Sequence, residues 1–173
     1  RAQLTPAGTA LYERARRVLR ELDDVKRSIA DLSGTIAGEL RLATSHHIGL
    51  HRLPEPLKQF HAAYPQVRLD LRFMDSEQAC SEVARGEIEL AIVTLPPKLE
   101  APLKADVVWD DPLDIVVARH HPLAEAHDVQ IKDLAAYPAI LPGPGTYTRE
   151  IVLKALGSWR DKIEIGMATN YLE

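Results

Sequence analysis

Residues 38–54 read GELRLATSHHIGLHRLP. Leu40 and Leu42 alternate with charged neighbours, which is typical of a strand, and from Leu53 onward apolar residues recur at helical spacing. A strand that turns directly into a helix is the repeating unit of an open α/β sheet. We therefore predict an α/β protein organised around this strand and the corner that follows it.

The corner between that strand and the helix is polar, and it consists of Thr44, Ser45, His46 and His47. In open α/β sheets, ligands bind beyond the carboxyl ends of the strands, and unpaired amides at a helix start favour an anion. These four residues are therefore predicted to bind a ligand. The alternative is that Ser45 only caps the helix, with the histidines solvated on its first turn.

Further strand and helix patterns extend this unit. Strands are predicted at 67–73 and 88–93, with a short helix between them that Gly86 closes. By Thr94 the chain has completed one βαβαβ half of a doubly wound sheet. A second set comprises strands near 105–109 and 113–118, a helix near 131–137, a strand at 139–141, a helix at 148–156 and a strand at 163–168. These elements are too few for another domain, so the second α/β unit is predicted to be incomplete.

A long amphipathic helix is predicted before the first strand, because Thr5-Pro6 is a strong helix start. Its apolar residues follow in alternating steps of four and three, which forms a heptad seam that needs a partner helix. We predict dimerisation through this seam; the alternative is packing on the chain's own domain. The predicted dimerisation residues are Leu11, Val18, Leu22, Val25, Ile29 and Leu32.

Composition limits the class of protein. The net charge of -4 provides no general attraction to nucleic acid or anionic membranes. The single cysteine, Cys80, excludes an internal disulfide and fits a reducing compartment. Neither a bilayer-spanning apolar run nor a secretory signal pattern is present, so we expect a soluble cytoplasmic protein.

The sequence carries no recognisable catalytic or metal-binding motif. Its adjacent histidine pairs, His46-His47 and His120-His121, point in different directions on a helix or strand, which disfavours a shared metal. We therefore expect no enzyme, no metal and no cofactor. The stretch Gly143-Pro144-Gly145-Thr146 is predicted to be a tight turn that presents Thr146 and Tyr147.

Several segments, in a fixed order, resemble the LysR-type transcriptional regulators. They are LTPAG at 4–8 before the long helix, GELRLA at 38–43, Leu53-Pro54, Tyr64-Pro65 and GEIELAI at 86–92. The resemblance implies a remnant of a winged helix-turn-helix DNA-binding domain at 1–4, a linker and dimerisation helix at 5–33, and a hinge at 34–38. It further implies effector subdomain I at 39–97 and a truncated effector subdomain II at 98–173.

In that family the two subdomains resemble periplasmic binding proteins and hold an inducer between them. Matching the motifs residue by residue implies effector contacts at Thr44, Ser45, His46, His47, Thr94, Thr146, Thr169 and Asn170. The corner looks most like that of the sulfur-metabolism regulators, whose hydroxyls hold sulfate. Because His47 replaces a hydroxyl, a larger or carboxylate-bearing anion is also expected.

The resemblance implies three kinds of partner: a small anionic effector such as sulfate, a sulfur metabolite or a carboxylate; DNA, through the amino-terminal domain; and further copies in a dimer or tetramer. The alternative function is a solute-binding protein of a transport system, which has the same cleft. Such a protein would need an export signal, and it has no reason to carry a heptad helix.

Overall fold

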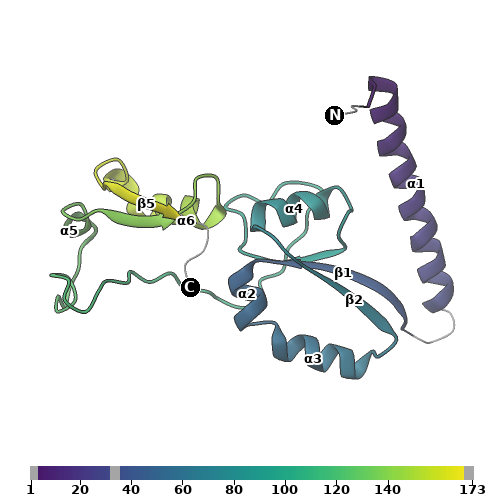
Figure 1. Cartoon of the computed structure of the whole chain (residues 1–173), viewed down its shortest axis with the longest axis horizontal. Helices are drawn as coiled ribbons and strands as arrows, with labels where there is room; N and C mark the ends of the chain where they lie inside the picture. The colour runs from purple at the N-terminus through teal and green to yellow at the C-terminus, as the bar shows by residue number, and fades with distance from the viewer. Residues whose placement is uncertain (1–3, 32–35, 170–173) are drawn as a thin grey trace.

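The fold comprises two parallel sheets with their helices and one long helix at the amino end (Figure 1). The structure, a computed structural model, describes residues 4–31 and 36–169. The first part contains α1 (Pro6–Asp31), β1 (Gly38–Thr44), α2 (His46–His51), α3 (Pro54–Ala63), β2 (Val67–Phe73), α4 (Ser76–Ala84) and β3 (Leu90–Ile92). The second contains α5 (Ile131–Leu134), β4 (Ala139–Pro142), α6 (Tyr147–Leu156), the 3-10 turn η1 (Gly157–Trp159) and β5 (Ile165–Thr169).

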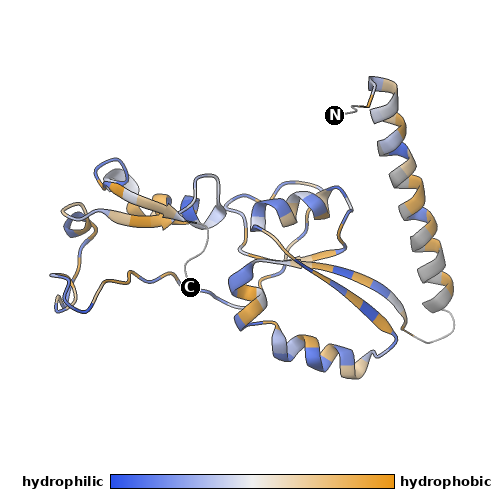
Figure 2. Ribbon diagram, in the orientation of Figure 1, coloured by the Kyte–Doolittle hydropathy of each residue, from blue (hydrophilic) through white to orange (hydrophobic). Residues whose placement is uncertain are grey.

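The first sheet confirms the predicted βαβαβ unit. Its strand order is β2-β1-β3, and both neighbours of β1 run parallel to it. Pairing aligns Leu40 with Leu69 and Leu42 with Leu71, so these apolar residues share one face. Figure 2 shows the alternation of polar and apolar residues along β1 and β2. The carboxyl ends of these strands therefore meet at one edge of the sheet.

Both faces of the sheet are packed near that edge. On one face, Ala43 forms a buried cluster with Ala79 of α4 and with Ile88. On the other face, α2 lies directly against the strand ends, because a Cβ atom at Gly49 would stand 2.4 Å from Phe73 Cε1 and 2.7 Å from Thr44 Cγ2. A larger residue would force the helix away. Gly49 therefore sets the position of the polar corner.

The second sheet joins β4 to β5 in parallel, with α6 beginning just after β4. The predicted strands and helices from residue 131 onward are confirmed with small shifts in their ends. The predicted strands at 105–109 and 113–118 are wrong, because the chain runs between β3 and α5 without regular structure. A strand needs a backbone partner, and there the apolar side chains of Val107 and Val116 are 71% and 89% exposed.

Helix α1 stands apart from the first sheet (Figure 1). It begins as predicted, with the Thr5 hydroxyl accepting a hydrogen bond from the Gly8 amide at 3.0 Å. The described members of the seam are more than half exposed, so the structure does not support packing of the seam on the chain's own domain; they are Leu11, Val18, Leu22, Val25 and Ile29. Leu32 lies outside the described residues.

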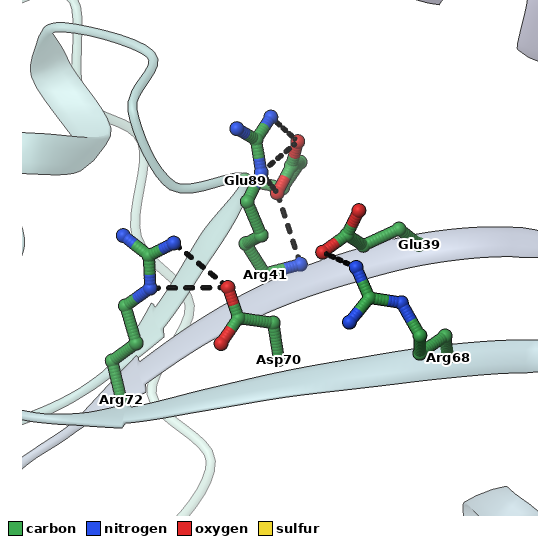
Figure 3. A network of polar contacts seen from close by, with 6 residues as sticks. All are labelled: Glu39, Arg41, Arg68, Asp70, Arg72 and Glu89. Atoms are coloured by element: carbon green, nitrogen blue, oxygen red, sulfur yellow. Dashed lines mark hydrogen bonds and ion pairs between the residues drawn. The ribbon is translucent and has the colours of Figure 1, made fainter.

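Three ion pairs occupy the face of the sheet that carries Ala43 (Figure 3). They join Glu39 to Arg68, Arg41 to Glu89, and Asp70 to Arg72. Glu89 accepts hydrogen bonds from both the backbone amide and the guanidinium of Arg41, which ties β1 to the turn before β3. The equal number of acidic and basic groups makes this face neutral.

The ion pair between Asp70 and Arg72 makes the stability of the fold depend on pH in the acidic range. The hydrogen bond from Arg72 lowers the pKa of Asp70 below its ordinary value of 3.8. A lowered carboxyl pKa stabilises the folded state above that value, and the contribution is lost as the pH falls through the folded-state pKa. Arg72→Ala should therefore raise the pKa of Asp70, as followed by carbon NMR of its carboxyl group. Arg160→Ala, which removes a partner of Asp161, should leave it unchanged. An unaltered titration in Arg72→Ala would contradict this explanation.

Candidate ligand-binding cavity

A cavity of about 520 Å³ lies between the two α/β units, and its size suits a small molecule. Residues from both units line it, together with part of the connecting segment. The lining residues are Ser45, His46, His47, Ile48, Arg52, Asp75, Ser76, Glu77, Thr94, Asp111, Pro112, Leu113, Asp114, Val116, Pro142, Thr146, Thr148 and Thr169.

Most of the residues predicted to bind a ligand lie around this single cavity. They are Ser45, His46, His47, Thr94, Thr146 and Thr169. Asn170 lies outside the described residues. The strand ends and helix starts of both units thus bring together residues up to 124 positions apart in sequence, from Ser45 to Thr169.

Thr44 is an exception, because it does not line the cavity. Its side chain is fully buried, and its hydroxyl donates to the carbonyl oxygen of Ile92 at 2.9 Å. Thr44 has the same strand parity as Leu40 and Leu42, so its side chain faces inward with theirs. It joins β1 to β3, and the prediction that it contacts a ligand is not supported.

The corner after β1 presents polar side chains to the cavity. Ser45 occupies the N-cap position of α2, with φ -72° and ψ 158°, yet its side chain makes no capping hydrogen bond. The alternative that Ser45 serves only as a cap is therefore not supported. The His46 ring lies 5.2 Å from the Phe73 ring, and the His47 ring lies 5.3 Å from that of His51.

The opposite wall is built by the turn that precedes α6. As predicted, this turn is tight: Gly145 adopts φ +84°, and the Thr146 hydroxyl donates to the carbonyl of Gly143 at 2.9 Å. The same hydroxyl caps α6 by accepting from the Arg149 amide at 3.3 Å. On the neighbouring wall, the amide of Thr94 donates to the Ser76 hydroxyl at 3.3 Å.

The charged residues of the cavity lining, among them Arg52 and Asp111, were not anticipated from the sequence. Arg52 Nη2 lies 3.3 Å from Asp111 Oδ1, and His47 Nε2 lies 3.8 Å from Asp111 Oδ2. Asp111 comes from the connecting segment, so these contacts attach that segment to α2. Arg52 and Asp111 are 59 positions apart, and no local pattern could have paired them.

Glu77 and Cys80 of α4 meet Tyr147 at the start of α6. The Tyr147 amide donates to a carboxylate oxygen of Glu77, and the Tyr147 side chain lies beside the Cys80 thiol. Burial raises the pKa of the Cys80 thiol. These contacts link the first α/β unit to the second at one end of the cavity.

In residues 4–31 and 36–169 no group of three or more histidine, cysteine or acidic residues is placed to hold a metal ion. No helix in the same ranges combines the length and apolarity that crossing a membrane requires.

Comparison with known proteins identifies the family. Residues 33–173 match the family model of the LysR substrate binding domain, so the chain belongs to this family. A probable RuBisCO transcriptional regulator of Synechocystis is 28% identical over 178 residues, which include the whole of this chain and 52% of that protein. The chain spans about half the length of the curated relatives it matches.

Two solved structures share the fold. A sulfate-bound regulatory domain of the OxyR2 E204G mutant from Vibrio vulnificus has a TM-score of 0.63 at 23% identity, covering 77% of this chain and 63% of that one. The effector binding domain of QuiR in complex with shikimate has a TM-score of 0.61 at 18% identity, covering 78% of this chain and 65% of that one.

The buried thiol of Cys80 should react slowly. A thiolate is the reactive form of cysteine, and burial here disfavours it. We expect iodoacetamide at neutral pH to alkylate the folded chain about tenfold or more slowly than N-acetylcysteine. Mass spectrometry measures the rate, and the same chain unfolded in urea provides the control. Equal rates in the folded and unfolded chain would show that Cys80 is accessible.

Proposed function

We propose that this chain is the effector-sensing and dimerising part of a bacterial transcription regulator. The main support is that six residues predicted to bind a ligand line one cavity between two α/β units, in a chain of the LysR family. By this proposal the regulator acts on DNA in the cytoplasm, through a winged helix-turn-helix domain that would precede Thr5.

The proposed effector carries an anionic group that binds at the corner after β1. Donors gather there, because the Ser45 hydroxyl, the two imidazoles and the Arg52 guanidinium line the cavity. Charge-assisted hydrogen bonds from such groups favour a carboxylate or sulfate. The ligands of the two similar structures, shikimate and sulfate, also carry anionic oxygens.

Signalling is proposed to work by a shift between conformations of the two units. A ligand that contacts His47 on one wall and Thr146 on the other favours the arrangement in which both walls reach it. Helix α1 is attached to β1 of the first unit and would transmit the change to the DNA-binding domains. A solute-binding protein of a transport system is disfavoured, because the exposed seam of α1 has no role in it.

The corner can be tested by anion binding. Ser45→Ala should weaken binding by about 0.5–1.5 kcal/mol, the net value of one hydrogen bond. His47→Ala should weaken binding by a similar amount, because it removes an imidazole N–H donor from the corner. Calorimetry with sulfate, thiosulfate, O-acetylserine and small carboxylates measures both effects.

His61→Ala is the matched control, since His61 is an exposed residue of α3 outside the cavity. If every anion binds equally weakly to the wild type and to all three variants, the corner is not an anion site.

Dimerisation can be tested in the seam of α1. Val18 and Val25 are about half exposed in the single chain, and a partner helix would bury them. Replacing both with glutamate should weaken association by several kcal/mol, at roughly 2 kcal/mol or more for each buried unpaired charge. Analytical ultracentrifugation measures the change. Thr9→Glu, which helical spacing places opposite the seam, should preserve the dimer; an unchanged dimer in the double variant would exclude the seam.

A further inference from the structure

We propose that Glu77 is a specificity-determining residue of the cavity. When one anionic group of the effector binds at the corner after β1, the Glu77 carboxylate excludes a second anionic group from the end formed by α4 and α6. The effector would then combine an anionic group at the corner after β1 with an ammonium or hydroxyl group at the Glu77 end. This inference rests on the proposed effector-binding function and narrows the class of effector.

The amides at the start of α6 already have acceptors within the protein. A helix start normally attracts an anion, because its first amides have no partners within the helix. Here the Tyr147 amide donates to Glu77 and the Arg149 amide donates to the Thr146 hydroxyl. The protein's own carboxylate therefore takes the place that a ligand anion would occupy.

Glu77 is held in place by the packing of α4 against the start of α6. Cys80 lies one helical turn after Glu77 on α4, is buried, and lies beside the side chain of the same Tyr147. Two positions one turn apart thus place α4 against the start of α6. A ligand anion would have to displace a carboxylate that the surrounding structure keeps in place.

The remaining charges of the cavity are mostly acidic. Among the described residues Arg52 is the one arginine that lines it, and it lies beside Asp111 near the corner. Asp75 and Asp114 line the cavity as well, and neither forms an ion pair with another described residue. A second anionic group in the ligand would meet carboxylates without a compensating cation, whereas a donor would meet acceptors.

A matched pair of probes tests the inference. Succinate and β-alanine share a carboxylate and two methylene groups, but the other end is a carboxylate in succinate and an ammonium group in β-alanine. Calorimetry should find that wild type binds β-alanine about tenfold more tightly than succinate, as expected for one charge-assisted contact. Glu77→Gln retains an acceptor for the Tyr147 amide but removes the charge, so it should abolish most of this preference.

Glu82→Gln is the control, because Glu82 lies on the same helix outside the cavity; it should keep the preference. The wild-type comparison needs no variant, so the test does not depend on the folding of Glu77→Gln, which circular dichroism checks. Succinate binding to wild type as tightly as β-alanine, with Ser45→Ala weakening both, would overturn the inference and retain the proposed function. Failure of wild type to bind β-alanine, succinate or sulfate would overturn both.

Discussion

The close approach of α2 to the ends of β1 and β2 is the constraint on which the cavity depends. Gly49 permits it, since any side chain there would collide with Phe73 and Thr44. With the helix this close, the short corner after Thr44 has to direct Ser45, His46 and His47 away from the sheet and into the gap between the two units. The absence of a side chain at Gly49 thus determines where the polar side chains of Ser45, His46 and His47 point.

Local sequence pattern predicted two kinds of element. They are caps and turns, whose hydrogen bonds join residues close in sequence, and strands in which polar and apolar residues alternate. The period of two in β1 and β2, the cap of α1 and the tight turn at Thr146 were all predicted. The segment from 105 to 118 has the composition of strands, but composition does not supply a neighbouring strand. Its apolar residues therefore remain exposed, and the prediction failed.

The sequence predicted which strand ends and helix starts line the cavity, but it did not predict the charged residues that line it. Strand ends and helix starts converge by topology, which is why the corner, Thr146 and Thr169 come together. The contacts of Arg52 with Asp111 and of Glu77 with Tyr147 join residues 59 and 70 positions apart. Such pairs leave no trace in local sequence, so the acidic character of the cavity emerges only from the fold.

Helix α1 has a mechanical consequence. At about 1.5 Å per residue, its 26 residues extend roughly 39 Å, and Figure 1 shows no other element alongside it. In the proposed regulator such a rod is a lever: a rotation of about 10° at its carboxyl end moves the other end by roughly 7 Å, about two base-pair steps along a DNA duplex. Under that proposal, rearrangements at the cavity too small to alter the sheets become displacements on the scale at which DNA is read.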